Sequence, residues 1–128
     1  MSSARPCLPF DDDPFECFSD ILENISHIES FLQGMGPVEL HNDQRTVFAC
    51  QYALLVISEA AKRLGPRAQE LCPGPPWRDI RGIGNRLRHA YDNLDSMMIW
   101  KVYQDDLPEL KIAVSAALEL LKKAQGPQ

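Results

Sequence analysis

Residues 75–92 read PPWRDIRGIGNRLRHAYD and set a histidine among several arginines. Trp77 follows a proline pair, and proline fits the first turn of a helix, so a helix is expected to begin here. Residues four apart share one face of a helix, so Arg81, Asn85 and His89 are expected to form a single row. A guanidinium, an amide and a titratable imidazole in one row are suited to holding a phosphate group and moving a proton.

Two glycines, Gly82 and Gly84, interrupt this predicted helix. Each costs about 1 kcal/mol in a helix interior relative to alanine. Two glycines within one turn indicate that another backbone or a ligand approaches closely at this point. We therefore expect one helix over this stretch, with a close contact on its glycine side.

The flanking sequence predicts further helices by its capping residues and apolar spacing. In chain order, the predicted elements are a helix from Pro14 to about Gly34, a short connection over 38–41, a helix that Asn42 or Asp43 caps and that ends at Leu64, one further turn within 66–72, the helix of the opening stretch, a helix over 97–104, and a last helix that Asp106 begins. No segment shows the two-residue alternation of a strand. These patterns predict an all-α fold, a bundle of about five helices without internal repeats. We expect residues 1–13 to be a flexible N-terminal tail and residues 14–124 to form one helical domain.

The second predicted helix is apolar on nearly all sides between residues 47 and 57. A helix with this pattern packs against several neighbours or across a subunit interface. Together with the glycines of the opening stretch, it predicts a homodimer with twofold symmetry and the motif at or near the interface.

Charge is unevenly distributed along the chain. The formal net charge is −5, yet residues 62–88 carry +5 and the remainder carries −10. An acidic total argues against indiscriminate coating of nucleic acid, whereas a local basic patch favours steered binding of an anion. Pairing of these arginines with acids on neighbouring helices is the alternative.

No run approaches the roughly 18 apolar residues that a membrane span needs, and the N-terminus lacks the pattern of a secretory signal. The four cysteines show neither a CxxC pair nor a histidine at metal-binding spacing. We therefore expect free thiols in a reducing cytoplasm, no metal site and no other cofactor.

Four motifs in order make the chain similar to a known family. ISEAAKRL at 57–64, PWRDIRG at 76–82, NRLRHAY at 85–91 and DLPEL at 106–110 resemble the HepT-like family, toxin ribonucleases of the HEPN superfamily. The resemblance extends over roughly Phe18 to Leu121. It implies a HEPN-type bundle that forms a homodimer. It also implies the toxin component of a type II toxin–antitoxin system, a metal-independent endoribonuclease with His89 as acid or base.

The resemblance further implies a partner, a nucleotidyltransferase antitoxin of the MNT type. In that system the antitoxin silences the toxin by attaching AMP to the tyrosine two residues after the histidine, here Tyr91. Such AMPylation adds phosphate charge and nucleotide bulk beside the arginines, and both effects oppose RNA binding. The alternative is that the Tyr91 ring packs against the bundle.

One position departs from the family motif. The family has arginine directly before the polar residue, where this chain has Gly84 followed by Asn85. We expect another guanidinium to take its place, and Arg81 ranks first because its helical phase puts it in the row of Asn85 and His89. Arg86 and Arg88 are the alternatives for that role. Arg78, Arg86 and Arg88 are also candidate contacts to RNA phosphates.

RNA supplies its own nucleophile, the 2′-hydroxyl, so cleavage needs a proton acceptor, a proton donor and charge stabilisation at the phosphate. His89 can take either proton role near neutral pH, Arg81 can hold the phosphate, and Asn85 can orient the imidazole or donate to a phosphate oxygen. Two functions follow. One is an RNA-cleaving toxin. The other is a helical protein that has lost cleavage with the motif arginine, and that dimerises and binds the antitoxin or RNA.

Overall fold

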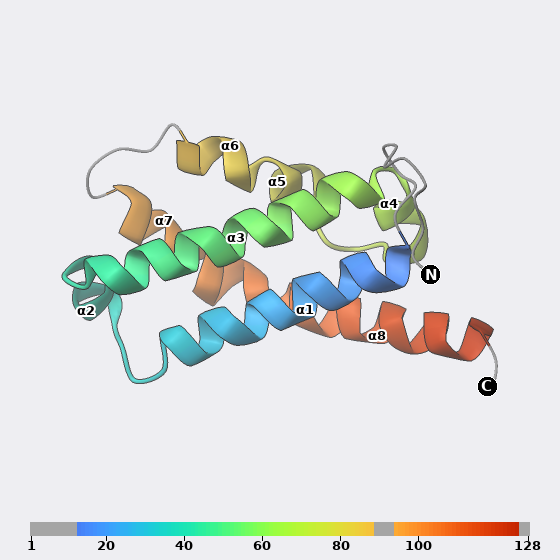
Figure 1. The fold of residues 1–128 in the computed structure, drawn as a ribbon, viewed down its shortest axis with the longest axis horizontal. Coiled ribbons are helices and arrows are strands. Elements are labelled where there is room, and N and C mark those ends of the chain that lie inside the picture. Colours follow the sequence, from blue (N-terminus) through green and yellow to red (C-terminus); the bar gives the residue numbers. More distant parts are fainter. Residues whose placement is uncertain (1–12, 89–93, 126–128) are drawn as a thin grey trace, which may run out of the picture.

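The computed structural model describes residues 13–88 and 94–125 of the chain. Within these ranges every regular element is helical, which confirms the predicted all-α class. Three long helices run along the molecule, namely α1 (Pro14–Phe31), α3 (Gln44–Leu64) and α8 (Leu107–Gln125) (Figure 1). α1 packs against both α3 and α8. In the described part of the chain, no helix combines the length and the apolar character that a membrane crossing requires.

α1 begins as its sequence predicts. Asp13 is the N-cap, and its carboxylate accepts a hydrogen bond of 3.0 Å from the backbone N–H of Phe15, while Pro14 occupies the first turn. Such a cap satisfies one of the N–H groups that have no partner within the helix. The apolar residues at helical spacing then form the buried face that packs on α3 and α8: Cys17, Phe18, Ile21, Ile25 and Ile28.

The expected connection over 38–41 is wrong, because these residues belong to a short helix, α2 (Pro37–His41). The Gly36 N–H donates to Glu39 Oε1 at 2.9 Å, and Pro37 fixes the backbone of the first turn. Leu40 is fully buried, so this single turn is held by packing as well as by its cap. Short turns of this kind make the described helical segments more numerous than the about five that were expected.

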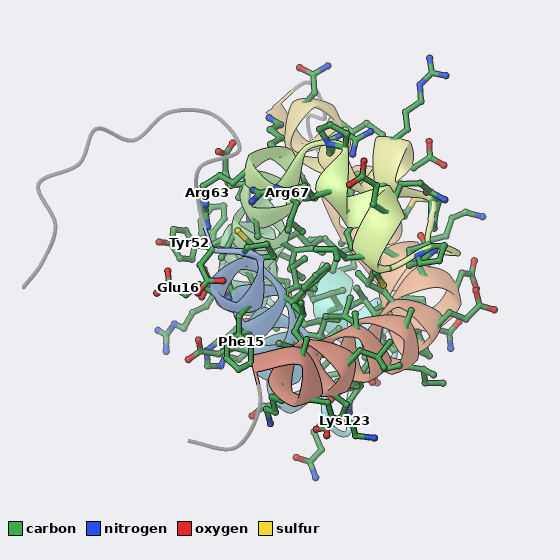
Figure 2. The ribbon with its side chains drawn as sticks, turned by 90° about the vertical axis from the view of Figure 1, so that its right-hand side faces the viewer. Phe15, Glu16, Tyr52, Arg63, Arg67 and Lys123 are labelled. Carbon is green, nitrogen blue, oxygen red and sulfur yellow. The ribbon has the colours of Figure 1, made fainter. Side chains whose placement is uncertain are left out.

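α3 is the central helix, in agreement with its apolar sequence. It contacts α1, α5, α6 and α7, begins at the N-cap Asp43 and ends at Gly65, whose φ of 58° is readily adopted by glycine. One strip of α3 nevertheless stays uncovered, since Phe48 is 59% exposed and Tyr52 is 70% exposed. Tyr52 projects from the same side of the molecule as Arg63 and Glu16 (Figure 2).

The opening stretch does not form one continuous helix. A predicted further turn, α4 (Arg67–Leu71), is confirmed, and α5 (Trp77–Arg81) and α6 (Ile83–Arg88) follow with a break at Gly82. The Gly82 N–H is shared between the carbonyls of Arg78 and Asp79, both at 3.1 Å, which tightens the turn there.

Trp77 anchors α5 in the core. It is 3% exposed, and its indole N–H donates to the Cys72 carbonyl at 2.8 Å. A buried indole needs such a partner, because leaving its N–H unpaired is costly.

The prediction that one helix ends near residue 104 and another begins at Asp106 is also wrong. α7 (Leu94–Lys101) passes through a π-helical turn, η1 (Val102–Asp106), directly into α8. Pro108 has no N–H to offer the carbonyl of Gln104, and its ring would press on that carbonyl in a regular α-helix. The wider π turn gives the proline ring room, so the helical backbone continues through Asp106, where the local sequence predicted the start of a new helix.

Candidate functional site

The polar side chains of α5 and α6 differ in their surroundings. Asp79 and Arg86 line a cavity between α5–α6 and α8. Arg78, Arg81 and Asn85 do not line it. Arg78 and Asn85 are exposed, and Arg81 is partly buried.

Arg78 and Arg81 carry charge that nothing in the described part of the chain neutralises. Among residues 13–88 and 94–125, neither guanidinium forms an ion pair or a side-chain hydrogen bond. Arg63, by contrast, pairs with Asp20 at 3.4 Å, and Arg67 donates to the carbonyls of Leu64 and Arg63 at the end of α3. The charges available to an anion are therefore on α5 rather than at the end of α3.

Ser58 of α3 holds the joint between α5 and α6. Its hydroxyl donates to the Arg81 carbonyl at 2.8 Å and accepts from the Gly84 N–H at 3.3 Å, and the residue is 1% exposed. The hydroxyl thus bonds two backbone groups on opposite sides of the helix break. Sequence reasoning did not select Ser58, although a serine between apolar residues and opposite two glycines is the signal that would have found it.

Gly84 packs directly against side chains of α3, where a backbone or a ligand was predicted to approach both glycines closely. A Cβ atom at this position would lie 3.3 Å from both Leu55 Cδ2 and Ser58 Oγ. Gly82 differs, since a Cβ atom there would meet only carbonyls of its own helix, at 3.5 and 3.6 Å. Position 84, where the family motif has arginine, is therefore a packing position in this chain.

His89, Tyr91 and the side chain of Arg88 lie outside the described residues. Arg81 and Asn85, the two described members of the predicted row, lie in different helices, α5 and α6, with Gly82 between these helices. The proposed roles of His89, Tyr91 and Arg88 stay predictions from the sequence.

Arg86 shares its cavity with acidic side chains, among them that of Asp106. Partial desolvation raises the pKa of the Asp106 carboxyl, the nearby charge of Asp105 raises it further, and the guanidinium of Arg86 and the ammonium of Lys101 oppose the rise. Part of the Arg86 charge is therefore balanced by Asp106. This position suits an RNA phosphate less well than those of Arg78 and Arg81.

The described residues offer no alternative nucleophile or metal centre with a clear geometry. Within them, no three His, Cys, Asp or Glu side chains gather closely enough to hold a metal ion. Burial raises the pKa of the Cys50 thiol to about 11 and also raises the pKa of Cys72, so both stay protonated at neutral pH. His41 contacts the Ser96 hydroxyl at 3.0 Å, between α2 and α7 and away from Arg81.

Comparison with protein-family models gives a match that covers most of the chain. The model of the ribonuclease HepT-like family matches residues 21–117, from within α1 to within α8, and so includes the α5–α6 site. The chain belongs to the HepT-like ribonuclease family.

Curated relatives of this HepT-like protein support the assignment. A probable ribonuclease HepT of Thermococcus cleftensis is 36% identical over 92 residues, which cover 72% of this chain and 84% of the relative. A putative RNase of Methanocaldococcus jannaschii is 30% identical over 92 residues, with the same two coverages of 72% and 84%. A putative RNase of Caldanaerobacter subterraneus subsp. tengcongensis is 26% identical over 99 residues, 77% of this chain and 88% of the relative. No solved structure gives a significant match.

Proposed function

We propose that this HepT-like protein is a metal-independent endoribonuclease that acts in the cytoplasm as the toxin of a type II toxin–antitoxin system. Membership of a family whose relatives are named ribonucleases supports this function. The observation that carries it in this chain is the pair Arg78 and Arg81 on α5, whose guanidinium groups lack partners among the described residues.

In this proposal RNA supplies the nucleophile, and the protein supplies the acid, the base and the positive charge around the phosphate. The 2′-hydroxyl attacks the adjacent phosphorus, the bond to the 5′-oxygen breaks, and a cyclic phosphate and a free 5′-hydroxyl result. His89 takes the proton of the nucleophile or gives one to the leaving oxygen. Arg81 stabilises the charge that develops on the phosphate, and Asn85 orients the imidazole or donates to a phosphate oxygen. Arg78 and Arg88 bind neighbouring phosphates, whereas Arg86, which lines the cavity with Asp106, is less suited to this role.

Assembly is part of the proposal, because two motif helices facing one cleft would let two copies of His89 divide the acid and base roles. The uncovered strip of α3 supports a homodimer, since Phe48 and Tyr52 expose large apolar surface. Tyr52 precedes Leu55 by about one turn, and Leu55 is one of the two α3 residues that a Cβ atom at position 84 would meet at 3.3 Å. A partner that covers this strip would thus lie beside α6.

Regulation follows from the same assignment. We expect an MNT-type nucleotidyltransferase as antitoxin, which attaches AMP from ATP to the hydroxyl of Tyr91 and releases pyrophosphate. The new phosphate would pair with the arginines near it, and the nucleotide would occupy space that RNA needs. Intact mass after incubation with ATP and the antitoxin would show the added AMP, and Tyr91→Phe would abolish the gain.

The decisive experiment compares two histidine variants on a labelled RNA. His89→Ala should lower the cleavage rate by at least about a hundredfold, because general acid–base groups commonly contribute that much. His27→Ala is the control, since His27 is exposed on α1 beside Glu23 and should leave the rate unchanged. Added EDTA should have no effect, and circular dichroism should match wild type. Cleavage by His89→Ala at the wild-type rate would refute the assigned role.

The packing of Gly84 favours a second function, binding without cleavage. A guanidinium at the motif position is missing, and the space beside Gly84 is filled by Leu55 and Ser58. If this function is correct, the wild-type protein should bind RNA or antitoxin and cleave nothing. Arg81→Ala separates the two functions. It should lower the cleavage rate about a hundredfold if Arg81 serves the transition state, and should only weaken RNA binding if the protein is a binder.

A further inference from the structure

One cavity lies between α5–α6 and α8, and neither Arg81 nor Asn85 lines it. It has a volume of about 390 Å³ and is bounded by α3, α5, α6, η1 and α8. Buried aliphatic side chains form much of its lining: Ile57, Ile80, Ile83, Val102, Leu107 and Leu110. Binding sites for small molecules are concave, mostly apolar and typically about 300–1,000 Å³ in volume.

The charged groups at this cavity are mainly acidic. Three carboxylates line it, those of Asp79, Asp106 and Glu109, against one guanidinium, that of Arg86, so its formal charge is −2. All four side chains belong to exposed residues at the rim, while the aliphatic lining is buried. An apolar interior beside a net negative rim is complementary to a molecule with an apolar body and one positive end.

The backbone at the cavity is also unusual. The π turn η1 contributes Val102 and Asp106 to the lining, and Leu107 follows directly. Single π turns within α-helices are found frequently at functional sites. The Asp106 carboxyl is partly desolvated there, and Asp105 adds like charge, so a bound cation would relieve an unfavourable carboxylate.

We propose that this cavity binds a small organic cation, an amine or guanidinium carried on an aromatic or aliphatic body. The body occupies the aliphatic lining, and the cationic group pairs with Asp106 and Glu109 at the rim. Neither Arg81 nor Asn85 lines this cavity, and binding there does not depend on cleavage or on the antitoxin.

Three probes with one ring system test the charge requirement. Tryptamine carries an ammonium group, tryptophol a neutral hydroxyl, and indole-3-propionate a carboxylate. We expect saturable binding of tryptamine by calorimetry or by NMR shifts of residues at the cavity. Tryptophol should bind about tenfold more weakly, because one charge-assisted hydrogen bond contributes roughly that factor, and indole-3-propionate should not bind.

Two neighbouring aspartates provide a matched pair of variants. Asp106→Asn should weaken tryptamine binding about tenfold. Asp105→Asn should change it less than about twofold, because Asp105 pairs with Lys101 at 3.7 Å and does not line the cavity. Ala113→Leu, which puts a larger side chain into the lining, should abolish binding of the ring while α8 stays helical.

The proposal is overturned by any of four results. The first is that tryptamine shows no saturable binding, and the second is that all three probes bind equally. The third is that Asp106→Asn and Asp105→Asn behave alike. The fourth is that Ala113→Leu binds tryptamine as wild type does. Circular dichroism and thermal unfolding of each variant distinguish loss of the site from loss of the fold.

Discussion

At the scale of single residues, Gly82 and Gly84 look alike in sequence and differ in the structure. Gly84→Ala should destabilise the protein by about 1 kcal/mol. Its Cβ would press on Ser58 and Leu55, and overpacking of this kind costs about 1–3 kcal/mol, which outweighs the gain in helix propensity of about 1 kcal/mol. Gly82→Ala should be neutral or stabilising by up to about 1 kcal/mol, because its Cβ meets only ordinary contacts.

Urea unfolding of the two variants measures this difference, with circular dichroism as the signal. Equal stability of Gly84→Ala and Gly82→Ala would show that α3 yields at this point, and an arginine at position 84 would then also be tolerated. The comparison therefore tests, at one residue, whether the departure from the family motif is fixed by packing.

At the scale of elements, the joint between α5 and α6 depends on one hydroxyl of α3. Ser58→Ala should lower the free energy of unfolding by about 1–3 kcal/mol, because the Arg81 carbonyl and the Gly84 N–H lose a buried partner. Hydrogen exchange of the Gly84 amide should accelerate more than exchange in the middle of α3. Ser115→Ala, at an exposed position of α8, is the control and should change neither quantity.

Retained protection of the Gly84 amide in Ser58→Ala would contradict this account of the joint. If Arg81 and Asn85 bind RNA, the same variant should also weaken RNA binding, since it loosens the backbone that presents them. Loss of stability without any change in RNA binding would mean that the joint is structural only.

Two of the elements that the sequence predicted correctly, α1 and α3, have ends that depend on neighbouring residues. Asp13 and Asp43 cap α1 and α3 through N–H groups two and three residues away, and Gly65 ends α3. The break at Gly82 was not predicted, because it involves Ser58, which lies far away in the chain. Local pattern cannot anticipate such a distant partner.

The same limit applies to the site. Helical phase grouped Arg81 with Asn85 on the basis of one continuous helix, whereas the structure divides them between α5 and α6. The acidic surroundings of Arg86 come from Asp106, twenty residues later on another element. The motif at Asp106 itself resembled a helix start, and the packing of Val102, Leu107 and Leu110 in the core prevailed over that local preference.

At the scale of the whole molecule, the exposed strip of α3 predicts the assembly. The wild-type protein should be a dimer at micromolar concentration, and Tyr52→Asp should shift it to monomer by placing a charge in the apolar interface. Leu120→Asp is the control, because Leu120 is 64% exposed on α8, which has no extensive contact with α3. Light scattering coupled to size exclusion gives the masses.

A wild-type monomer would contradict the homodimer and with it the division of acid and base between two copies of His89. A dimer that Tyr52→Asp leaves intact and Leu120→Asp dissociates would place the interface on α8 instead. Either result would mean that the exposed strip of α3 does not form the dimer interface.

The contact between Ser58 and Gly84 also makes positions 58, 55 and 84 interdependent in sequence change. An arginine at position 84 would press on the Ser58 hydroxyl and a Leu55 methyl group, since a Cβ atom there already lies 3.3 Å from both. A smaller residue at position 55, or loss of the Ser58 hydroxyl, would reduce this conflict. Glycine at the motif position is thus maintained by its neighbours on α3, and any engineered return to the family motif has to begin there.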